Sequence, residues 1–417
     1  MTKKSDAPAI RFKGFSDAWE QRKLGELVDR VVRKNINNES TLPLTISAQY
    51  GLVDQITYFN NRVASRDVSN YYLVLNGEFA YNKSTSDGYP FGAVKRLDLY
   101  EKGVLSTLYI VFAPKKEQQI DSDYLTVFFD TDRWHKGVAE RAAEGARNHG
   151  LLNISAEDFF DIDLSVPKDI VEQKQIGAFI RQFDHLITLH QRKFEKLTNV
   201  KKSMLEKMFP QNGSSYPEIR FKGFTDPWEQ RKLGEMGQTY TGLSGKTKDD
   251  FGHGQARFVT YMNVFSNPIS NPEMTEPIEI DPKQNEVEVG DVFFTTSSET
   301  PEEVGMSSIL LEKRGKTYLN SFCFGFRPSE KIDSYYLAYM LRSESARAKI
   351  TLLAQGISRY NISKNKVMEI AVSLPSLDEQ KMIGQYFSQL DNLITLHQRE
   401  LEKLQNIKKS MLEKMFV

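Results

Sequence analysis

The chain has 417 residues, of which 40% are hydrophobic and 26% charged, so it is long enough for two or more domains with buried cores. No apolar run approaches the roughly 20 residues that span a bilayer, and the first residues lack the apolar stretch of a secretory signal. A single cysteine, Cys323, excludes an internal disulfide and fits a cytoplasmic location. The net charge of zero argues against a protein that coats nucleic acid, while leaving room for a local basic surface.

The first element in chain order is an opener, IRFKGFSDAWEQRKLGE (10–26), which returns as IRFKGFTDPWEQRKLGE (219–235) with 15 of 17 positions identical. A long segment follows each opener, and the two segments have strongly diverged. Only landmarks correspond between them, such as GEFAYNKS (77–84) with GDVFFTTS (290–297), and the triplet NIS at 153 and at 361. A constant part therefore introduces a part that differs between the two halves of the chain.

Within the two diverged segments, strand-like stretches alternate with turn signals. The clearest stretches are YYLVLNGEFAYNKS (71–84), STLYIVFAP (106–114), ARFVTYMNVF (256–265) and KTYLNSFCFGFRP (316–328). A helical patch follows late in each segment, at 122–145 and at 333–356. The pattern predicts two α+β domains, each with a mostly antiparallel, curved sheet.

A long helix closes each half of the chain. FDHLITLHQRKFEKLTNVKKSMLEKMF (183–209) and LDNLITLHQRELEKLQNIKKSMLEKMF (390–416) share 21 of 27 positions. Apolar side chains follow an alternating 4–3 spacing upstream of and through both copies, which is typical of a coiled-coil seam. The predicted seam residues are Ile176, Ile180, Phe183, Ile187, His190, Phe194 and Leu197 in the first copy, and Ile383, Phe387, Leu390, Ile394, His397, Leu401 and Leu404 in the second.

The two helices are expected to pair with each other in antiparallel fashion. A helix over 172–208 would be about 55 Å long at ~1.5 Å per residue, and such a rod needs a partner. The first helix leads to the second domain through the Pro-, Gly- and Ser-containing joint PQNGSSYP (210–217), so the second helix begins near the end of the first. This path also brings the two ends of the sequence together. His190 and His397, at equivalent seam positions, are interpreted as a polar pair that sets the register, with a ligand site or a pH switch as the less favoured alternative.

Motifs of catalysis are missing from the sequence. GLSGKTK (242–248) approaches a phosphate-binding loop, but Tyr240 stands where that loop needs its first glycine. No HExxH, paired CxxC, GxSxG or GxGxxG occurs, and the Asn-Pro-Pro-aromatic pattern of adenine methyltransferases is absent. The histidines do not follow metal-ligand spacing, so no metal site is expected. We therefore expect a chain without an active site of its own.

Two pairs of polar loops stand at equivalent places in the halves and are the candidates for contact with a ligand. They are YNKSTSDGYPFG (81–92) with TTSSETPEEVG (295–305), and GARNHG (145–150) with GISRYN (356–361). Their side chains suit phosphates and base edges, although ordinary polar loop tips have the same composition. The candidate DNA-binding residues are Asn82, Lys83, Ser84, Thr85, Arg147, Asn148, His149, Thr295, Thr296, Ser297, Ser298, Ser358, Arg359 and Tyr360.

At its full length the chain resembles the specificity subunits of type I restriction-modification enzymes. The resemblance is carried by VPKDIVEQKQIGAFIRQFDHLI (166–187) and LPSLDEQKMIGQYFSQLDNLI (374–394), each with a Pro, then Glu-Gln, then a helix containing Asp-x-x-Ile. The opener and the late Gly…Asn-Ile-Ser segment match as well. By this resemblance Glu172, Gln173, Glu379 and Gln380 begin the two constant helices. The implied division is 1–166 and 219–373 as target-recognition domains, 167–209 and 374–417 as spacer helices, and 210–218 as the linker.

The resemblance implies a DNA-binding subunit that is not an enzyme. Each domain would read one half of a bipartite, asymmetric DNA sequence, and the spacer would set the gap between the halves. Two modification subunits, which methylate adenine, would dock on the constant parts, and restriction subunits would join through them. S-adenosylmethionine, ATP and Mg²⁺ are then expected on the partner subunits, with no cofactor on this chain. The alternative is an adaptor without DNA, in which the coiled coil spaces two protein-binding domains.

Overall fold

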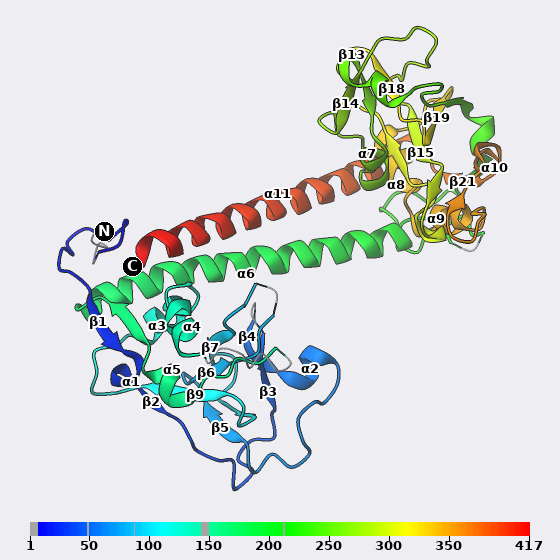
Figure 1. Cartoon of the computed structure of the whole chain (residues 1–417). Helices are drawn as coiled ribbons and strands as arrows, with labels where there is room; N and C mark the ends of the chain where they lie inside the picture. The colour runs from blue at the N-terminus through cyan, green and yellow to red at the C-terminus, as the bar shows by residue number, and fades with distance from the viewer. Residues whose placement is uncertain (1–6, 48–49, 87, 143–149, 212) are drawn as a thin grey trace. The chain divides into compact units, whose positions relative to one another are not determined.

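The computed structural model describes residues 7–47, 50–86, 88–142, 150–211 and 213–417. Its internal contacts divide the chain into two compact units, residues 1–190 with 400–417 and residues 191–399. Each unit therefore holds one diverged segment together with one end of each long helix (Figure 1). Within the described ranges, no helix is both long and apolar enough to cross a membrane.

Unit 1 is built on small antiparallel sheets. A four-stranded sheet has the order β2-β9-β6-β7, and β1 pairs with β10 immediately before the first long helix. Two further strand pairs, β3-β4 and β5-β8, are attached to this framework. The strands are β1 (Glu20–Lys23), β2 (Val28–Arg30), β3 (Leu44–Ser47), β4 (Gly51–Asp54), β5 (Tyr72–Leu75), β6 (Phe79–Asn82), β7 (Ala93–Arg96), β8 (Lys102–Leu105), β9 (Ile110–Pro114) and β10 (Asp163–Val166).

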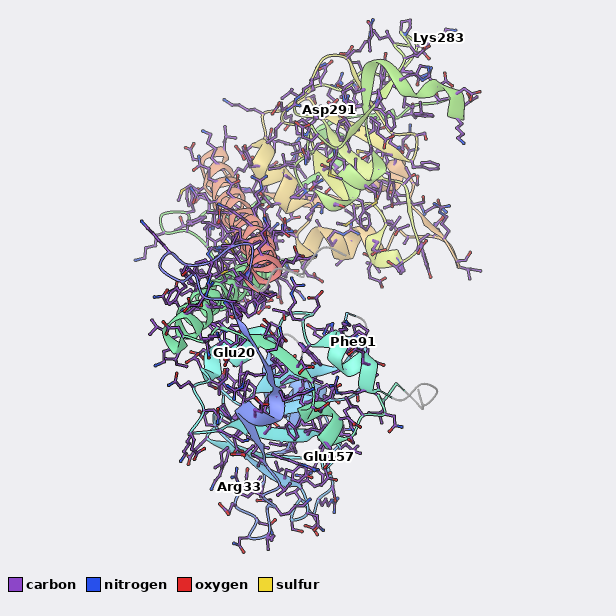
Figure 2. The ribbon with its side chains drawn as sticks, turned by 60° about the vertical axis from the view of Figure 1, so that its left-hand side comes forward. Glu20, Arg33, Phe91, Glu157, Lys283 and Asp291 are labelled. Carbon is purple, nitrogen blue, oxygen red and sulfur yellow. The ribbon has the colours of Figure 1, made fainter. Side chains whose placement is uncertain are left out.

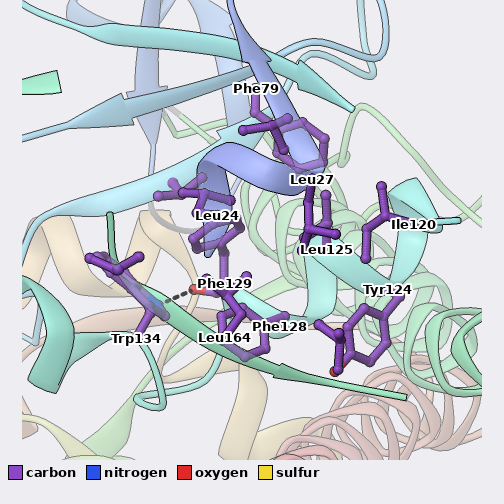
Figure 3. Close-up of a cluster of buried hydrophobic side chains, with 14 of the residues drawn as sticks. Leu24, Leu27, Phe79, Ile120, Tyr124, Leu125, Phe128, Phe129, Trp134 and Leu164 are labelled. Carbon is purple, nitrogen blue, oxygen red and sulfur yellow. Dashed lines mark hydrogen bonds between the residues drawn. The ribbon is translucent and has the colours of Figure 1, made fainter. Parts of the chain in front are cut away.

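Short helices connect these strands, and all of them except the one at Gln55–Phe59, which has no buried residue, pack around one aromatic-rich core. They are α1 (Leu24–Leu27), α2 (Gln55–Phe59), α3 (Ser122–Phe128), α4 (His135–Arg141) and α5 (Ala156–Phe160). Phe79, Phe112 and Trp134 are almost fully buried in this core. Figure 3 shows Phe79 and Trp134 together with side chains from α1 and α3. The Trp134 indole keeps its one donor satisfied, because Nε1 donates to the carbonyl of Phe129 at 3.2 Å.

Unit 2 repeats the framework with a different periphery. Its four-stranded sheet, β12-β19-β15-β17, has the same topological order, and β11 pairs with β21 just before the second long helix. In place of the extra pairs of unit 1 it carries a three-stranded sheet, β14-β13-β18, in which β13 and β18 run parallel. The strands are β11 (Glu229–Lys232), β12 (Gly237–Thr241), β13 (Phe251–Val259), β14 (Thr275–Ile278), β15 (Val292–Thr295), β16 (Ser297–Ser298), β17 (Ser307–Ile309), β18 (Thr317–Leu319), β19 (Cys323–Pro328), β20 (Tyr360–Asn361) and β21 (Ala371–Leu374).

The helices of unit 2 correct one sequence-based expectation. They are α7 (Tyr261–Ser266), α8 (Ser334–Met340), α9 (Glu344–Thr351) and α10 (Lys364–Met368), with 3-10 turns η1 (Leu233–Glu235), η2 (Lys248–Asp250) and η3 (Pro301–Glu303). The stretch 256–265 was expected to be strand-like throughout, and this is wrong after Val259. Thr260 accepts a hydrogen bond from the backbone N–H of Asn263 and so caps the start of α7.

The two long helices are α6 (Ile170–Lys207) and α11 (Leu377–Met415), close to the bounds that the sequence predicts. They pair in antiparallel fashion within each unit. In unit 1 the Lys408 ammonium contacts the Asp184 carboxylate at 2.6 Å, and in unit 2 Lys201 forms the equivalent ion pair with Asp391. Moving 17 residues forward on α6 therefore moves 17 residues back on α11. The predicted antiparallel coiled coil is confirmed.

Burial along the seam changes with position. The seam residues nearest the domains are buried: Ile176, Ile180, Ile383, Phe387 and Leu390. The rest of the predicted seam is half-buried: Phe183, Ile187, His190, Phe194, Leu197, Ile394, His397, Leu401 and Leu404. Two helices alone cover only part of each seam side chain, whereas a domain core covers all of it.

The repeated motif MLEKMF ends each helix inside a domain core. Met415 and Phe416 lie in the core of unit 1, where the Phe416 ring packs edge-on against Trp19 at 6.1 Å between centroids. Met208 and Phe209 fill the same place in unit 2, with Phe209 at 6.3 Å from Trp228. The helix that leaves one diverged segment therefore completes the core of the other, which explains why the two helix ends are alike.

Candidate DNA interface

A buried ion pair fixes the start of each long helix to the opener of the same unit. In unit 1 the Arg11 guanidinium donates to both carboxylate oxygens of Glu172, at 2.6 and 2.8 Å. In unit 2 Arg220 donates to Glu379 at 2.8 Å for both contacts. Both carboxylates are 1% exposed. The hydrogen bonds to the carboxylates raise the pKa of Arg11 and of Arg220, so both guanidinium groups stay charged. These four side chains hold the framework in register.

The glutamine that follows each buried glutamate forms hydrogen bonds with the backbone at the start of a neighbouring short helix. Gln173 accepts a hydrogen bond from the backbone N–H of Asp121 at 2.8 Å and donates to the carbonyls of Gln119 and Pro167. Gln380 accepts likewise from the N–H of Asp333 and donates to Pro375. The Glu-Gln dipeptide, noted in the sequence only by resemblance, is thus a pair of buried, satisfied polar groups.

The opener is joined to the helix end in the same way in both units. The backbone N–H of Ile219 donates to the carbonyl of Lys207 at 2.9 Å, a contact across the linker. The N–H of Ile10 donates to the carbonyl of Lys414 at 3.0 Å, although these residues lie at opposite ends of the sequence. The ends are close together, as the sequence predicts.

The Gly-Glu dipeptide at 77–78 and the Gly-Asp dipeptide at 290–291, which correspond between the two halves, each place a buried carboxylate just before a central strand. Glu78 precedes β6 and receives the Arg33 guanidinium at 2.7 and 2.8 Å. Asp291 precedes β15 and receives Arg327 at 2.7 and 2.8 Å, and the hydroxyl of Tyr240 donates to it as well. Figure 2 marks Arg33 and Asp291 in their respective units. Both units have the acid at this place, but the arginine differs in origin: Arg33 lies in the segment after β2, whereas Arg327 lies in β19.

In unit 1 the structure joins the two candidate loops side by side. Thr85 donates from its backbone N–H to the carbonyl of Gly150 at 2.7 Å, and the N–H of Leu152 donates to the carbonyl of Lys83 at 3.0 Å. Ser84 is exposed, whereas Asn82, Lys83 and Thr85 are half-buried. The Lys83 ammonium contacts the carbonyl of Ile154 at 3.3 Å. The candidates Arg147, Asn148 and His149 lie outside the described residues.

In unit 2 the equivalent loops pair as strands. β16 and β20 are antiparallel, with Ser297 opposite Asn361 and Ser298 opposite Tyr360. Ser358 and Arg359 are exposed beside this pairing, and Thr296 and Tyr360 are half-buried. Three sequence candidates are buried: Thr295, Ser297 and Ser298. Because a buried side chain cannot reach DNA without rearrangement, these three are the least accessible of the candidates, and their contact with DNA stays a prediction.

Two arginines that sequence reasoning missed hold the loops of unit 2 in place. Arg347 of α9 donates to the carbonyls of Glu302, Val304 and Gly305 at 2.6 to 2.8 Å. Burial lowers the pKa of Arg347 to about 10. Arg342 holds the carbonyl of Ser307 in the same manner, at 2.7 Å. No local pattern distinguishes these arginines from surface ones, since their acceptors are backbone carbonyls far along the chain.

The loop that approaches a phosphate-binding motif has another structure. Lys246 lies in an ion pair with Asp281 at 2.9 Å and near Asp250, and only the 3-10 turn η2 follows it before β13. A phosphate-binding loop needs a free lysine and the N-terminus of a full helix. We therefore interpret residues 242–248 as a structural loop of unit 2 and not as a phosphate-binding site.

Comparison with known proteins decides the family. The model of the type I restriction modification DNA specificity domain matches twice, over residues 17–199 and 225–406. The chain belongs to the family of type I restriction-modification specificity subunits. This family recognises DNA targets and is non-catalytic. Each match begins inside one opener and spans its later part, one diverged segment and most of one long helix.

Similar curated proteins are specificity subunits of Methanocaldococcus jannaschii. The type I restriction enzyme MjaVIII specificity subunit is 24% identical over 375 residues, covering 85% of this chain and 82% of that protein. The putative MjaX specificity subunit is 22% identical, covering 94% and 92%.

Solved structures show the same fold. The S subunit of a type I restriction-modification system from M. genitalium has a TM-score of 0.56 at 14% identity, with 99% of both chains covered. A chain from a study of complex assembly and conformational transition in a type I system has a TM-score of 0.50 at 16% identity, covering 95% of this chain and 97% of that one. In this specificity subunit, then, the loop pairs described above lie in the two matched DNA specificity domains.

Proposed function

We propose that this specificity subunit reads a bipartite, asymmetric DNA sequence and positions modification and restriction subunits on it. One observation carries the proposal. The two units share a framework, and each presents a joined pair of loops at the same place, but the loops differ in sequence. A protein with two domains of the same framework but different loop sequences is expected to recognise two half-sites of different sequence.

The contacts with DNA would come from the accessible loop residues. In unit 1 these are Asn82, Lys83, Ser84 and Thr85, with Arg147, Asn148 and His149 from the sequence. In unit 2 they are Thr296, Ser358, Arg359 and Tyr360. Lysine and arginine would bind phosphates and fix the register, while amide, hydroxyl and guanidinium groups would read base edges.

The paired helices would act as the spacer between the half-sites. A helix of the length of α6, 38 residues, is about 57 Å long, which is compatible with half-sites about one turn of DNA apart, roughly 34 Å. Such a spacer fixes the gap by its length and its continuous backbone.

Exposed leucines on the long helices support docking of a partner. Leu186 and Leu189 on α6 are 40% and 39% exposed, and the equivalent Leu393 and Leu396 on α11 are 44% and 52% exposed. All four lie outside the seam, one turn apart on each helix. Large apolar side chains that are exposed twice at the same place suggest a surface that a partner covers twice. We infer two copies of one modification subunit, one on each unit.

The chemistry of the assembled complex would reside in these partners. The modification subunits would bind S-adenosylmethionine and methylate adenine, and restriction subunits using ATP and Mg²⁺ would join through them. This chain would recognise the DNA sequence and position the partner subunits on it.

The test begins by mapping methylated adenines in a host that carries the specificity and modification subunits. We expect a bipartite motif with unlike halves. Gel-shift titrations at increasing salt, with and without modification subunit, should show binding of that duplex that weakens steeply with salt, because phosphate contacts release counterions. Absence of any motif and of DNA binding would leave the protein adaptor as the better explanation.

A second arm tests the docking surface with Leu186→Glu and Leu393→Glu. Each substitution should weaken capture of modification subunit at one unit, and the two together should abolish it, as measured by mass photometry. His185→Glu and Asn392→Glu are the matched controls, because these neighbouring exposed positions differ between the two copies. Full assembly by the leucine variants would contradict this docking surface.

A further inference from the structure

The loop 355–361 of unit 2 carries an apolar side chain at its tip. Ile357 is 96% exposed, more than any other large hydrophobic residue in the described ranges. Ser358 and Arg359 beside it are exposed as well, and Leu352, where α9 ends, is 85% exposed. An isolated exposed aliphatic residue is ordinary on a protein surface, but here it lies in the middle of a candidate DNA-reading loop.

The loop is a closed hairpin with little conformational freedom. The N–H of Gln355 donates to the carbonyl of Asn361 at 3.0 Å, and the N–H of Asn361 donates back to Gln355 at 2.8 Å. Gly356 has φ +148°, and a Cβ there would lie 2.0 Å from the carbonyl oxygen of Arg359. Only glycine fits this position. The turn is therefore built to hold one shape.

The base of the hairpin is anchored in the framework. Its second strand, β20, pairs with β16, and the next residue, Ile362, is buried in the core of unit 2. The N–H of Ile362 donates to the carbonyl of Thr296 at 3.0 Å. Because base and turn are both fixed, Ile357 is presented to solvent before any ligand binds, and little ordering entropy is lost on contact.

The surroundings of the tip disfavour phosphate as its ligand. The segment paired with the hairpin carries three exposed carboxylates, Glu299, Glu302 and Glu303. Carboxylates repel the phosphate backbone, and an isoleucine offers it no hydrogen bond. Base edges remain as the part of DNA that such a tip can meet. The apolar group on a base edge is the C5 methyl of thymine, which lies in the major groove.

We propose that Ile357 is a specificity-determining residue of unit 2 that packs against a thymine C5 methyl in its half-site. The proposal rests on the proposed DNA-reading function. Arg359, two residues on, brings a guanidinium to the same tip, which suits the acceptors on the base edge of a neighbouring guanine. The hairpin is then a preformed finger whose apolar tip selects thymine over cytosine at one position.

The experiment uses full-length chain with its modification subunit and duplexes that contain the mapped motif. Exchanging residues 27–165 for those of a relative identifies the half-site that stays unchanged, which is the one read by unit 2. Each thymine in that half is then replaced, one at a time, by deoxyuridine, which removes only the C5 methyl. Dissociation constants are measured for the wild type, Ile357→Ala, Ile357→Val and the control Val289→Ala, an exposed aliphatic residue elsewhere in unit 2.

For the wild type we expect one deoxyuridine position to weaken binding about fourfold, the value of one buried methyl group. Ile357→Ala should weaken binding to the thymine duplex and respond no further to that deoxyuridine. Ile357→Val and Val289→Ala should keep the wild-type response. The proposal is overturned if the half-site contains no thymine, if no position responds in the wild type, or if Ile357→Ala responds as the wild type does. The proposed function itself fails only if the wild type shows no motif and no DNA binding.

Discussion

The two units differ most where they would meet DNA and least where they hold the long helices. Both have the same order in the four-stranded sheet, the same buried Arg–Glu pair and the same helix end in the core. Around this framework unit 1 adds two strand pairs, whereas unit 2 adds the sheet β14-β13-β18. The comparison teaches that a small number of buried polar and aromatic contacts is enough to keep the architecture while the rest of the sequence changes.

The joined loops make the contrast sharper. In unit 1 the first loop carries Lys83 and the exposed Ser84, whereas in unit 2 it carries three exposed glutamates beside Arg359 and Ile357. In both units the backbones of the two loops are hydrogen-bonded to each other. The framework thus fixes where the loops lie and leaves their chemistry free to differ.

The largest effect is expected from exchanging one diverged segment. Replacing residues 27–165 by those of a related specificity subunit should change one half of the methylated motif entirely and leave the other half and the gap unchanged. The physical reason is that each core is closed within its own unit. Mapping of methylated adenines provides the measurement, and a change in both halves would show that the two heads are not independent.

Removing the phenylalanine ring at the end of each long helix should lower the free energy of unfolding by nearly as much as the largest truncations of core side chains do. Phe416→Ala and Phe209→Ala are each expected to destabilise their own unit by about 4 kcal/mol, because both rings are buried among aromatic partners. Hydrogen exchange followed by peptide mass spectrometry would report each unit separately. Lys409→Ala and Lys202→Ala, at equivalent exposed positions, are the controls. Equal loss of protection in both units from either single variant would contradict the assignment of each helix end to one core.

Breaking a buried Arg–Glu pair should have a somewhat smaller effect. Glu172→Ala leaves Arg11 charged and largely buried, and we expect a loss of about 3 kcal/mol, with the same loss for Glu379→Ala. Thermal or urea denaturation would measure it. The double variant Arg11→Met with Glu172→Met should recover most of the stability, since apolar residues of similar length can replace a buried ion pair. Failure of this rescue would mean that the charge itself is required.

The smallest effect is expected from joining the two ends of the sequence and reopening the chain in the linker 210–218. The hydrogen bond from Ile10 to Lys414 matches the one from Ile219 to Lys207, so the new connection would follow a geometry already present in unit 2. The permuted chain should unfold at nearly the wild-type temperature and direct methylation to the same motif. Loss of assembly with the modification subunit would argue against this equivalence.

Much of the fold follows from the sequence because its signals are local or repeated. The 4–3 spacing gives the two long helices nearly to the residue, and the duplicated opener gives the two equivalent domains. The path of the chain gives the antiparallel pairing and the proximity of Ile10 to Lys414. The prediction of a strand beyond Val259 is wrong because a threonine cap starts a helix there, and a β-branched run does not reveal that cap.

The tertiary structure alone decided which groups meet. Arg11 and Glu172 are 161 positions apart, and the arginines that hold Glu78 and Asp291 come from non-equivalent parts of the two units, so no periodicity predicts either contact. Composition marks Thr295, Ser297 and Ser298 as candidate contacts, but only the structure shows that they are buried, because a polar side chain can bind the backbone as well as a ligand. Ile357 shows the converse: an apolar residue in a polar loop gives no signal of a site until a closed hairpin is seen to hold it in solvent.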